Sequence, residues 1–164
     1  MSGLVYDYII ENFKNGEPIF LSELPGESKD YLRQEMKKLV DEGKLERLYN
    51  GVYYLSYITI LGTKGKISVD KYIEKKYLET DGKVSGYITG LQMANKYGFT
   101  TQNPACYEVC SNEASTKQRK QEIDGNTIVV YKPVADISEE NKTALQFLDG
   151  FEIVYTIKIN NDTE

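Results

Sequence analysis

Basic residues recur at every fourth position within residues 28–42. Lys29, Arg33 and Lys37 are spaced by four, so a helix through this segment would place them on one side. Their cations suit phosphate groups, and the Arg33 guanidinium and the Gln34 amide suit the edges of bases. The spacing indicates a surface for nucleic acid, although exposed helices of many proteins carry lysines that contact only solvent.

The apolar residues of the same segment predict the helix that would carry these cations. They follow one helical stripe, formed by Leu32, Met36, Leu39 and Val40. Ser28 can cap the start of the helix, and Gly43 can adopt the left-handed conformation that ends it. We therefore expect a helix over residues 28–42 with its basic residues facing outward.

A β-hairpin is predicted directly after this helix. Two short segments, residues 44–49 and 52–57, flank Asn50-Gly51. This dipeptide is a strong hairpin signal, because a type I′ turn needs two residues that tolerate positive φ. The hairpin would carry Arg47 and Asn50 near its tip.

The first part of the chain completes the pattern of a winged helix-turn-helix. Residues 4–15 have the apolar spacing of a helix, residues 16–18 interrupt it, and residues 19–24 are long enough for one or two helical turns. Pro25-Gly26 then turns the chain into the long helix. Because the second helix of such a motif enters the major groove, we predict a DNA-binding domain over residues 1–61. The candidate DNA-contacting residues are Ser28, Lys29, Arg33, Gln34, Lys37, Lys38, Arg47 and Asn50.

The charge balance of the chain weighs against DNA binding. Its 164 residues carry 20 Lys and Arg against 25 Asp and Glu, for a net charge of −5. Residues 1–62 hold 7 basic and 10 acidic side chains, a balance of −3, whereas nucleic-acid-binding domains usually carry a basic surplus. Binding to double-stranded DNA would then depend on local placement of the cations and on a homodimer on the DNA. The alternative is a protein-interaction module that uses the winged helix as a dimer or partner platform and does not bind DNA.

The residue types argue against catalysis and metal binding. Histidine is absent, which excludes histidine-based acid–base chemistry and the common histidine metal sites. Cys106 and Cys110 would lie about 13 Å apart on a strand at roughly 3.3 Å per residue, too far apart for a disulfide. A restriction-type nuclease would need neighbouring acidic and lysine side chains at a metal, but Glu140 and Lys142 would diverge on a helix. We expect no catalytic residue, no metal ligand and no cofactor.

The hydropathy of the chain contains no membrane signal. No apolar run approaches the length of a membrane span, and the N-terminus lacks the pattern of a signal peptide. We therefore expect a cytoplasmic protein without membrane contacts.

A small α+β domain is predicted over residues 67–164, after a Gly- and Lys-rich linker at residues 62–66. We expect helices at residues 68–78, 85–97 and 138–148, strands at 107–111, 119–123, 127–132 and 151–159, and turns at Asp81-Gly82 and Asp124-Gly125. The predicted fold class is thus α+β, with an N-terminal winged helix-turn-helix followed by a small α+β domain.

Two polar segments of this second domain are candidates for partner binding. Pro104 restricts Asn103 to an extended conformation, and this approach to a strand could present Gln102 and Asn103 to a partner. A structural turn whose side chains bond to the backbone would explain them as well. Lys117, Arg119 and Lys120 form the densest basic cluster of the chain. They could contact DNA phosphates or an acidic protein surface, or protect a solvated strand edge.

Residues 87–112 resemble the signature of the AbiEi antitoxin family, and residues 43–54 resemble the wing of that family. The matching positions of the signature are Gly98, Phe99, Thr100, Gln102, Pro104, Val109, Ser111 and Asn112. The resemblance covers most of residues 1–148 and implies an antitoxin of a bacterial type IV toxin–antitoxin (abortive infection) operon. It also implies a winged helix that represses the operon and a second domain that counteracts a nucleotidyltransferase-like toxin, AbiEii. From Gly150 onward the sequence does not resemble the longer helical C-terminus of that family.

Overall fold

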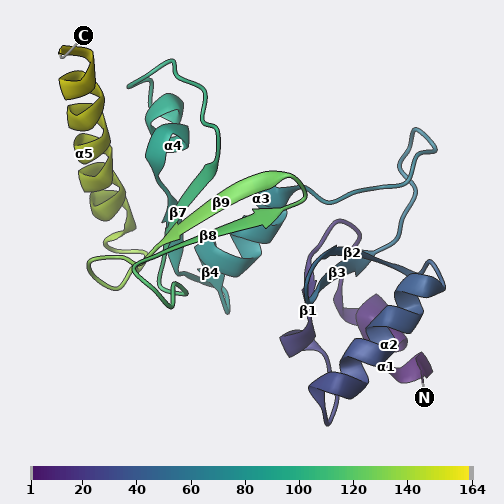
Figure 1. The fold of residues 1–164 in the computed structure, drawn as a ribbon. Coiled ribbons are helices and arrows are strands. Elements are labelled where there is room, and N and C mark those ends of the chain that lie inside the picture. The colour runs from purple at the N-terminus through teal and green to yellow at the C-terminus, as the bar shows by residue number, and fades with distance from the viewer. Residues whose placement is uncertain (1, 163–164) are drawn as a thin grey trace. The chain divides into compact units, whose positions relative to one another are not determined.

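The computed structural model describes residues 2–162 and has mixed α and β structure (Figure 1). The chain forms two compact units, residues 1–72 and 73–164. The sequence predicts a linker at residues 62–66, whereas the boundary between the units follows Tyr72. Ile67, Val69 and Tyr72 are buried, so the chain is already packed a few residues beyond the predicted linker.

The first unit combines two α-helices with a three-stranded antiparallel sheet in the order β1–β3–β2. Along the chain its elements are α1 (Ser2–Asn12), β1 (Ile19–Phe20), a 3-10 turn (Leu21–Glu23), α2 (Lys29–Asp41), β2 (Leu45–Tyr49) and β3 (Val52–Leu55). Residues 19–24 thus form a short strand and a single 3-10 turn, where the sequence left room for one or two helical turns. Ile19 is fully buried and pairs with Tyr53.

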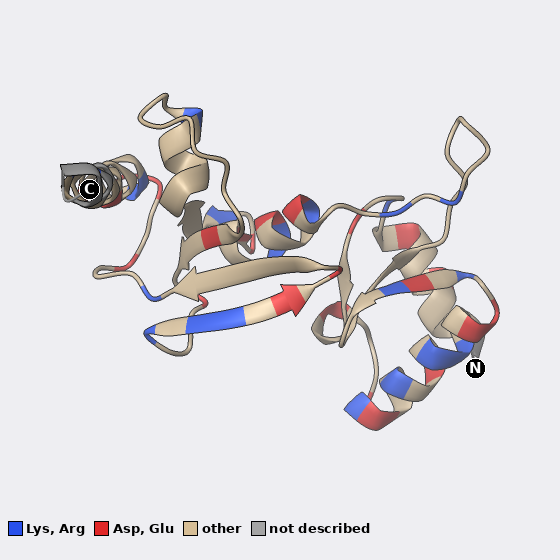
Figure 2. Ribbon diagram, turned by 45° about the horizontal axis from the view of Figure 1, so that its top comes forward, with Lys and Arg blue, Asp and Glu red and all other residues tan. Residues whose placement is uncertain are grey.

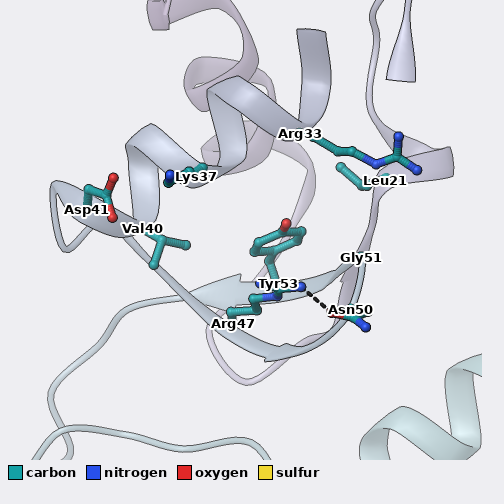
Figure 3. A pocket seen from close by; sticks show the side chains of 9 residues that line it. All are labelled: Leu21, Arg33, Lys37, Val40, Asp41, Arg47, Asn50, Gly51 and Tyr53. Carbon is teal, nitrogen blue, oxygen red and sulfur yellow. Dashed lines mark hydrogen bonds between the residues drawn. The ribbon is translucent and has the colours of Figure 1, made fainter. Parts of the chain in front are cut away.

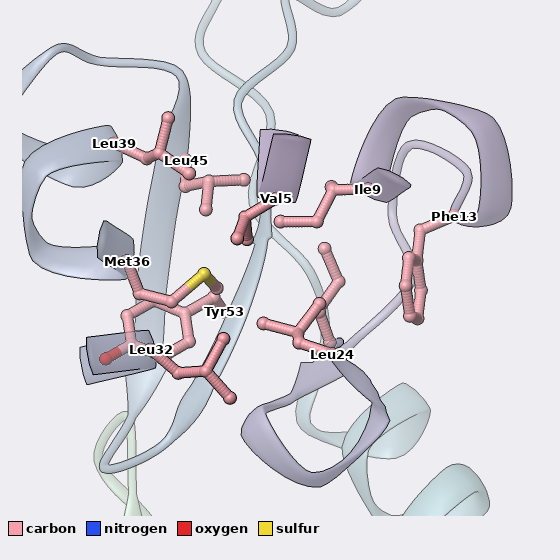
Figure 4. Packing of buried hydrophobic residues seen from close by; sticks show 10 residues of the cluster. Val5, Ile9, Phe13, Leu24, Leu32, Met36, Leu39, Leu45 and Tyr53 are labelled. Atoms are coloured by element: carbon pink, nitrogen blue, oxygen red, sulfur yellow. The ribbon is translucent and has the colours of Figure 1, made fainter. Parts of the chain in front are cut away.

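One apolar core holds the first unit together (Figure 4). The predicted α2 stripe faces it, with Leu32, Met36 and Leu39 buried and Val40 half-buried. The other buried members come from α1, from the sheet and from the segments between them: Val5, Ile9, Phe13, Ile19, Leu24, Leu45 and Tyr53. Since full burial of such a side chain contributes about 1.5–3 kcal/mol, this core fixes α2 against the sheet and leaves its opposite side in solvent.

The predicted ends of α2 are confirmed. The Oγ atom of Ser28 accepts a hydrogen bond from the backbone N–H of Tyr31 at 3.2 Å. Gly43 has a φ of +72° and follows the last turn, and its N–H donates to the carbonyl of Val40 at 2.9 Å.

The predicted hairpin is present, but its turn differs from the predicted type I′. Gly51 has a φ of +75°, whereas Asn50 does not have positive φ. The pairing between β2 and β3 shifts by one residue between Arg47 and Tyr49, which is a β-bulge. A type I turn followed by a glycine in the left-handed region produces this arrangement.

The second unit contains a four-stranded mixed sheet in the order β6–β7–β9–β8 and a two-stranded β4–β5 ribbon. Its elements, with the helix that leads into it, are α3 (Val69–Ile73), a π-helical turn (Glu74–Leu78), β4 (Glu79–Thr80), β5 (Lys83–Val84), β6 (Gly86–Ile88), α4 (Gly90–Lys96), β7 (Tyr107–Ser111), β8 (Gln118–Ile123), β9 (Asn126–Tyr131) and α5 (Lys142–Asp162). The predicted strands at 107–111, 119–123 and 127–132 are confirmed within one residue. Helices α4 and α5 lie side by side next to β6 and β7 (Figure 1).

The predicted helix over residues 85–97 is wrong in its first half. Residues 86–88 form strand β6, which pairs antiparallel with β7. A Cβ atom on Gly86 would lie 2.1 Å from the carbonyl oxygen of Tyr77, so only glycine allows this close approach. Gly90 has a φ of +68° and separates the strand from α4.

The predicted strand at residues 151–159 is also wrong, because α5 continues through it to Asp162. The short helix predicted at 138–148 instead starts at Lys142 and joins this longer helix. The alternation of apolar and polar residues over 151–159 predicted a strand. The first turns of α5 pack against α4 and β6, and the chain continues from them as one helix. Within the described residues, no helix has both the length and the apolar character needed to cross a membrane.

Candidate nucleic-acid interface

Helix α2 presents its predicted cations to solvent. Lys29, Arg33, Gln34, Lys37 and Lys38 are all exposed. The helical spacing places Arg33 and Lys37 on one side and Gln34 and Lys38 on the neighbouring side. Figure 2 shows basic and acidic residues alternating along this helix.

Arg33 is paired with an acidic residue one turn earlier. Its Nη1 atom lies 2.9 Å from Oδ1 of Asp30, and the two side chains are 61% and 86% exposed. An ion pair this exposed contributes little to stability. Arg33 can therefore exchange Asp30 for another anion at small cost.

Arg47 is held at the tip of the hairpin. Its Nη2 atom donates to the side-chain oxygen of Asn50 (dashed line in Figure 3), and its Nε atom donates to the carbonyl of Tyr49 at 3.4 Å. The two predicted hairpin residues are thus one hydrogen-bonded pair. This pairing orients the guanidinium before any ligand arrives.

An open hollow of about 680 Å³ lies between α2 and the hairpin (Figure 3). Its lining includes four of the predicted residues: Arg33, Lys37, Arg47 and Asn50. The other lining residues are Leu21, Val40, Asp41, Gly51 and Tyr53. The tertiary structure therefore brings together cations from two elements that the sequence predicted separately.

The charge inside this hollow is opposite to that of the unit around it. Arg33, Lys37 and Arg47 contribute three positive charges to the lining, and Asp41 contributes one negative charge. The unit as a whole, residues 1–72, carries 11 acidic and 10 basic side chains, a balance of −1. An anion with several charges along its length would thus be attracted to this hollow rather than to the unit in general.

Four predicted residues lie outside the hollow. Ser28 caps α2, while Lys29, Gln34 and Lys38 are exposed on the same helix. Sequence reasoning missed Tyr53, which is 6% exposed, lines the hollow and pairs across the hairpin with Arg47. A simple two-residue turn would pair Arg47 with Tyr54, so the bulge places Tyr53 beside Arg47.

The predicted partner residues of the second unit lie in two separate places. Gln102 and Asn103 are exposed in the loop between α4 and β7. The loop is closed by side-chain bonds to the backbone of Gln102: Asn95 Nδ2 donates to its carbonyl at 3.1 Å, and Thr100 Oγ1 accepts from its N–H at 3.2 Å. These bonds fix the backbone of the loop at Gln102.

The basic cluster lies at the β8 edge of the four-stranded sheet. Arg119 and Lys120 belong to the edge strand β8, and Lys117 precedes it. All three are exposed, and the Nζ atom of Lys120 lies 3.9 Å from Oε1 of Glu122. Strand β9 separates this edge from β7, so the cluster and the loop do not form one site.

Several residues between Tyr87 and Asn112 have structural roles in the second unit. Gly98 has a φ of +74° after the end of α4. Ser111 Oγ donates to the carbonyl of Tyr77 at 2.7 Å, and the Asn112 side chain both donates to and accepts from the backbone of Ile137. These positions thus fix the fold around the loop.

A polar cluster joins α5 to β6. Asp149 Oδ2 accepts hydrogen bonds from Tyr87 Oη at 2.9 Å and from Thr89 Oγ1 at 3.1 Å. Burial raises the pKa of Tyr87 above its usual range, and burial also raises the pKa of the neighbouring Cys110 thiol. The two hydrogen bonds to Asp149 attach α5 to β6 and to the residue that follows it. Within residues 2–162, no group of three or more Cys, Asp or Glu side chains is arranged to hold a metal ion.

No protein-family model matches the sequence, and no curated protein sequence matches it.

Proposed function

We propose that this protein is the antitoxin and transcriptional repressor of a bacterial type IV toxin–antitoxin operon, with a winged helix-turn-helix as its DNA-binding unit. The observation that carries the DNA-binding part of the proposal is the cationic hollow, whose lining includes Arg33 and Lys37 of α2 together with Arg47 and Asn50 of the hairpin. In the proposed complex α2 enters the major groove and the hairpin reaches the minor groove or the backbone. Because bacterial promoter DNA lies in the cytoplasm, the proposal assigns the protein to that compartment.

The order of the elements supports a winged helix more strongly than the charges do. A helix, a short strand, a single turn and a second helix are followed by a hairpin that pairs with the first strand. Such a fold buries one side of α2 in the core and leaves the other available for a groove. The width of an α-helix with side chains, about 10–12 Å, matches the major groove of about 12 Å.

The antitoxin part of the proposal depends on the resemblance of residues 87–112 to AbiEi. An AbiEii-like nucleotidyltransferase toxin is the proposed protein partner. Its candidate contacts are Gln102, Asn103, Lys117, Arg119 and Lys120, all exposed on the second unit. Since the loop and the basic edge are separate, each would contact a different part of such a partner.

The alternative function is a protein-interaction module that does not bind DNA. The acidic balance of residues 1–62 favours it. Failure of the purified protein to bind its own promoter at low salt, together with capture of a protein partner, would select this alternative.

The test is a gel-shift titration that measures binding of the purified protein to the DNA directly upstream of its own reading frame. The double substitution Arg33→Ala and Lys37→Ala should weaken binding by at least about tenfold, because each lost phosphate or base contact costs on the order of 1 kcal/mol. Lys14→Ala removes an exposed cation of the same unit outside the hollow and should leave binding within about twofold. Unchanged affinity in the double variant would contradict the assignment of α2 to the groove.

A further inference from the structure

The outer side of α5 is a continuous apolar surface. Phe147, Leu148, Phe151 and Tyr155 are 57%, 63%, 64% and 68% exposed. Their spacing of one, three and four residues places them on one side of the helix. We call these four residues the α5 stripe. Exposed apolar patches of this extent mark interaction surfaces more often than isolated exposed residues do.

The opposite side of the same helix is firmly attached to the second unit. Gln146 Nε2 donates to the carbonyl of Ile88 at 2.8 Å, and Asp149 accepts from Tyr87 and Thr89. Gly150 lies against Met93, whose Cε atom would be 3.1 Å from an added Cβ. These contacts fix the rotation of α5, so the stripe cannot turn inward without breaking them.

Two further exposed aromatic residues lie beside the α5 stripe. The rings of Tyr97 and Phe99 stack at 6.2 Å between centroids, and both are about half exposed. Phe99 lies beside Gly150, where its Cε2 atom would be 3.8 Å from an added Cβ. The end of α4 thus continues the apolar surface along one border of α5.

We propose that the stripe is the self-association surface of this protein, at which the α5 helices of two copies pack in parallel around a twofold axis. The size of the surface fits such a dimer. Aromatic side chains bury about 150–250 Å² each, so the exposed parts of the six residues amount to roughly 700 Å² per copy. A stable interface of standard size takes about 800 Å² from each partner.

The charges at the borders of the α5 stripe favour the parallel orientation of the two helices. At 100° per residue, the exposed residues Glu152 and Lys158 lie about 60° to either side of Tyr155. In a parallel twofold pair, the acidic border of each helix lies beside the basic border of the other, so both borders attract. In an antiparallel pair, the acidic border of one helix lies beside the acidic border of the other, and the basic borders lie together, so like charges repel.

The first test is the molar mass of the full chain in solution, measured by sedimentation equilibrium over a wide range of concentration. We expect a reversible dimer. Phe151→Glu should raise its dissociation constant by at least about thirtyfold, because it places a charge at the centre of an apolar interface. Val134→Glu makes the same change at a residue that is 94% exposed elsewhere in the second unit and should have no effect. A monomer at every concentration, or a dimer insensitive to Phe151→Glu, overturns the proposal.

The second test reports orientation and does not depend on the stability of a charged variant. In a parallel twofold pair every level of the helix faces its own copy, so Leu148→Cys and Tyr155→Cys should each form a covalent dimer on mild oxidation. In an antiparallel pair, self-crosslinking is confined to the level of the axis. Val134→Cys and the unmodified chain, with its half-buried Cys106 and buried Cys110, serve as controls. Crosslinking at one position only, or at neither, contradicts the parallel arrangement.

Discussion

At the scale of single residues, Tyr131 connects two strands of the second unit through its hydroxyl group. Tyr131 lies on β9, and its Oη atom donates to Glu108 Oε1 on β7 at 3.0 Å. Burial raises the pKa of Tyr131 to about 12, and the adjacent Glu108 carboxylate adds to this effect. The folded protein therefore requires the neutral phenol in a range of pH where an unfolded tyrosine ionises.

This requirement predicts a loss of stability at high pH. Below the unfolded pKa of about 10, Tyr131 is neutral in both states and has no pH effect. Between pH 10 and about 12 the unfolded state releases the proton first, so the free energy of unfolding falls. In Tyr131→Phe this fall should be smaller, as measured by urea denaturation on both sides of the window.

In Tyr131→Phe, part of the fall in the free energy of unfolding at high pH should remain, because the pKa of Tyr87 is raised as well. Tyr97→Phe removes the hydroxyl of a residue that is 54% exposed and should retain the full decline. If Tyr131→Phe and the unmodified protein lose stability equally, burial and the hydrogen bond to Glu108 do not keep the Tyr131 phenol neutral in the folded state.

At the scale of elements, α2 is positioned by its two ends and by its buried stripe. The Ser28 hydroxyl satisfies an N–H at the first turn, and Gly43 ends the helix. Because Leu32, Met36 and Leu39 face the core, the caps determine which residues the helix contains and the core determines which side faces the hairpin. Both are needed to place Arg33 and the hairpin around one hollow.

Loss of the N-cap should destabilise the first unit measurably. Ser28→Ala leaves the N–H of Tyr31 without its side-chain acceptor, and such substitutions cost about 1 kcal/mol. Ser28→Asn retains an acceptor and should restore most of that loss. Urea denaturation monitored by circular dichroism compares the two; equal stability of both variants would show that the Ser28 hydroxyl does not stabilise α2.

At the scale of the whole molecule, local and total charge have opposite signs. The net charge is −5, while the hollow holds three cations against one carboxylate. Under the proposed function, DNA contact therefore depends on the local cations of the hollow and not on the net charge of the chain. A dimer through α5 would supply two such surfaces to one DNA duplex.

The proposed function predicts a steep dependence of DNA affinity on salt. Each phosphate neutralised contributes about −0.9 to the slope of log K against log salt concentration, so three or four contacts give roughly −3 to −4 per copy. Arg47→Ala should reduce the magnitude of this slope by about one. The measurement is fluorescence anisotropy over a salt series, and a slope near zero would exclude a phosphate-based interface.

The sequence by itself determined the features that depend on residues close together in the chain. The helix over residues 28–42, its caps and the following hairpin are all local patterns, and the structure confirms them. The turns at Asp81-Gly82 and Asp124-Gly125 are confirmed as well, with positive φ at all four residues. For the same reason the sequence alone predicted the exposed cations of α2 and of the hairpin, although it did not show which residues lie next to them.

Only the tertiary structure decided the features that depend on distant partners. Residues 86–88 form a strand because β7 pairs with them and the carbonyl of Tyr77 leaves no room for a Cβ on Gly86. Residues 151–159 alternate in hydropathy like a strand, yet they continue the helix that Asp149 attaches to β6. The hollow exists because the core sets α2 against the sheet and the bulge turns Arg47 toward Tyr53. The periodicity of a sequence predicts the structure of one segment at a time, whereas strand β6, the length of α5 and the hollow depend on contacts between segments that are distant in the chain.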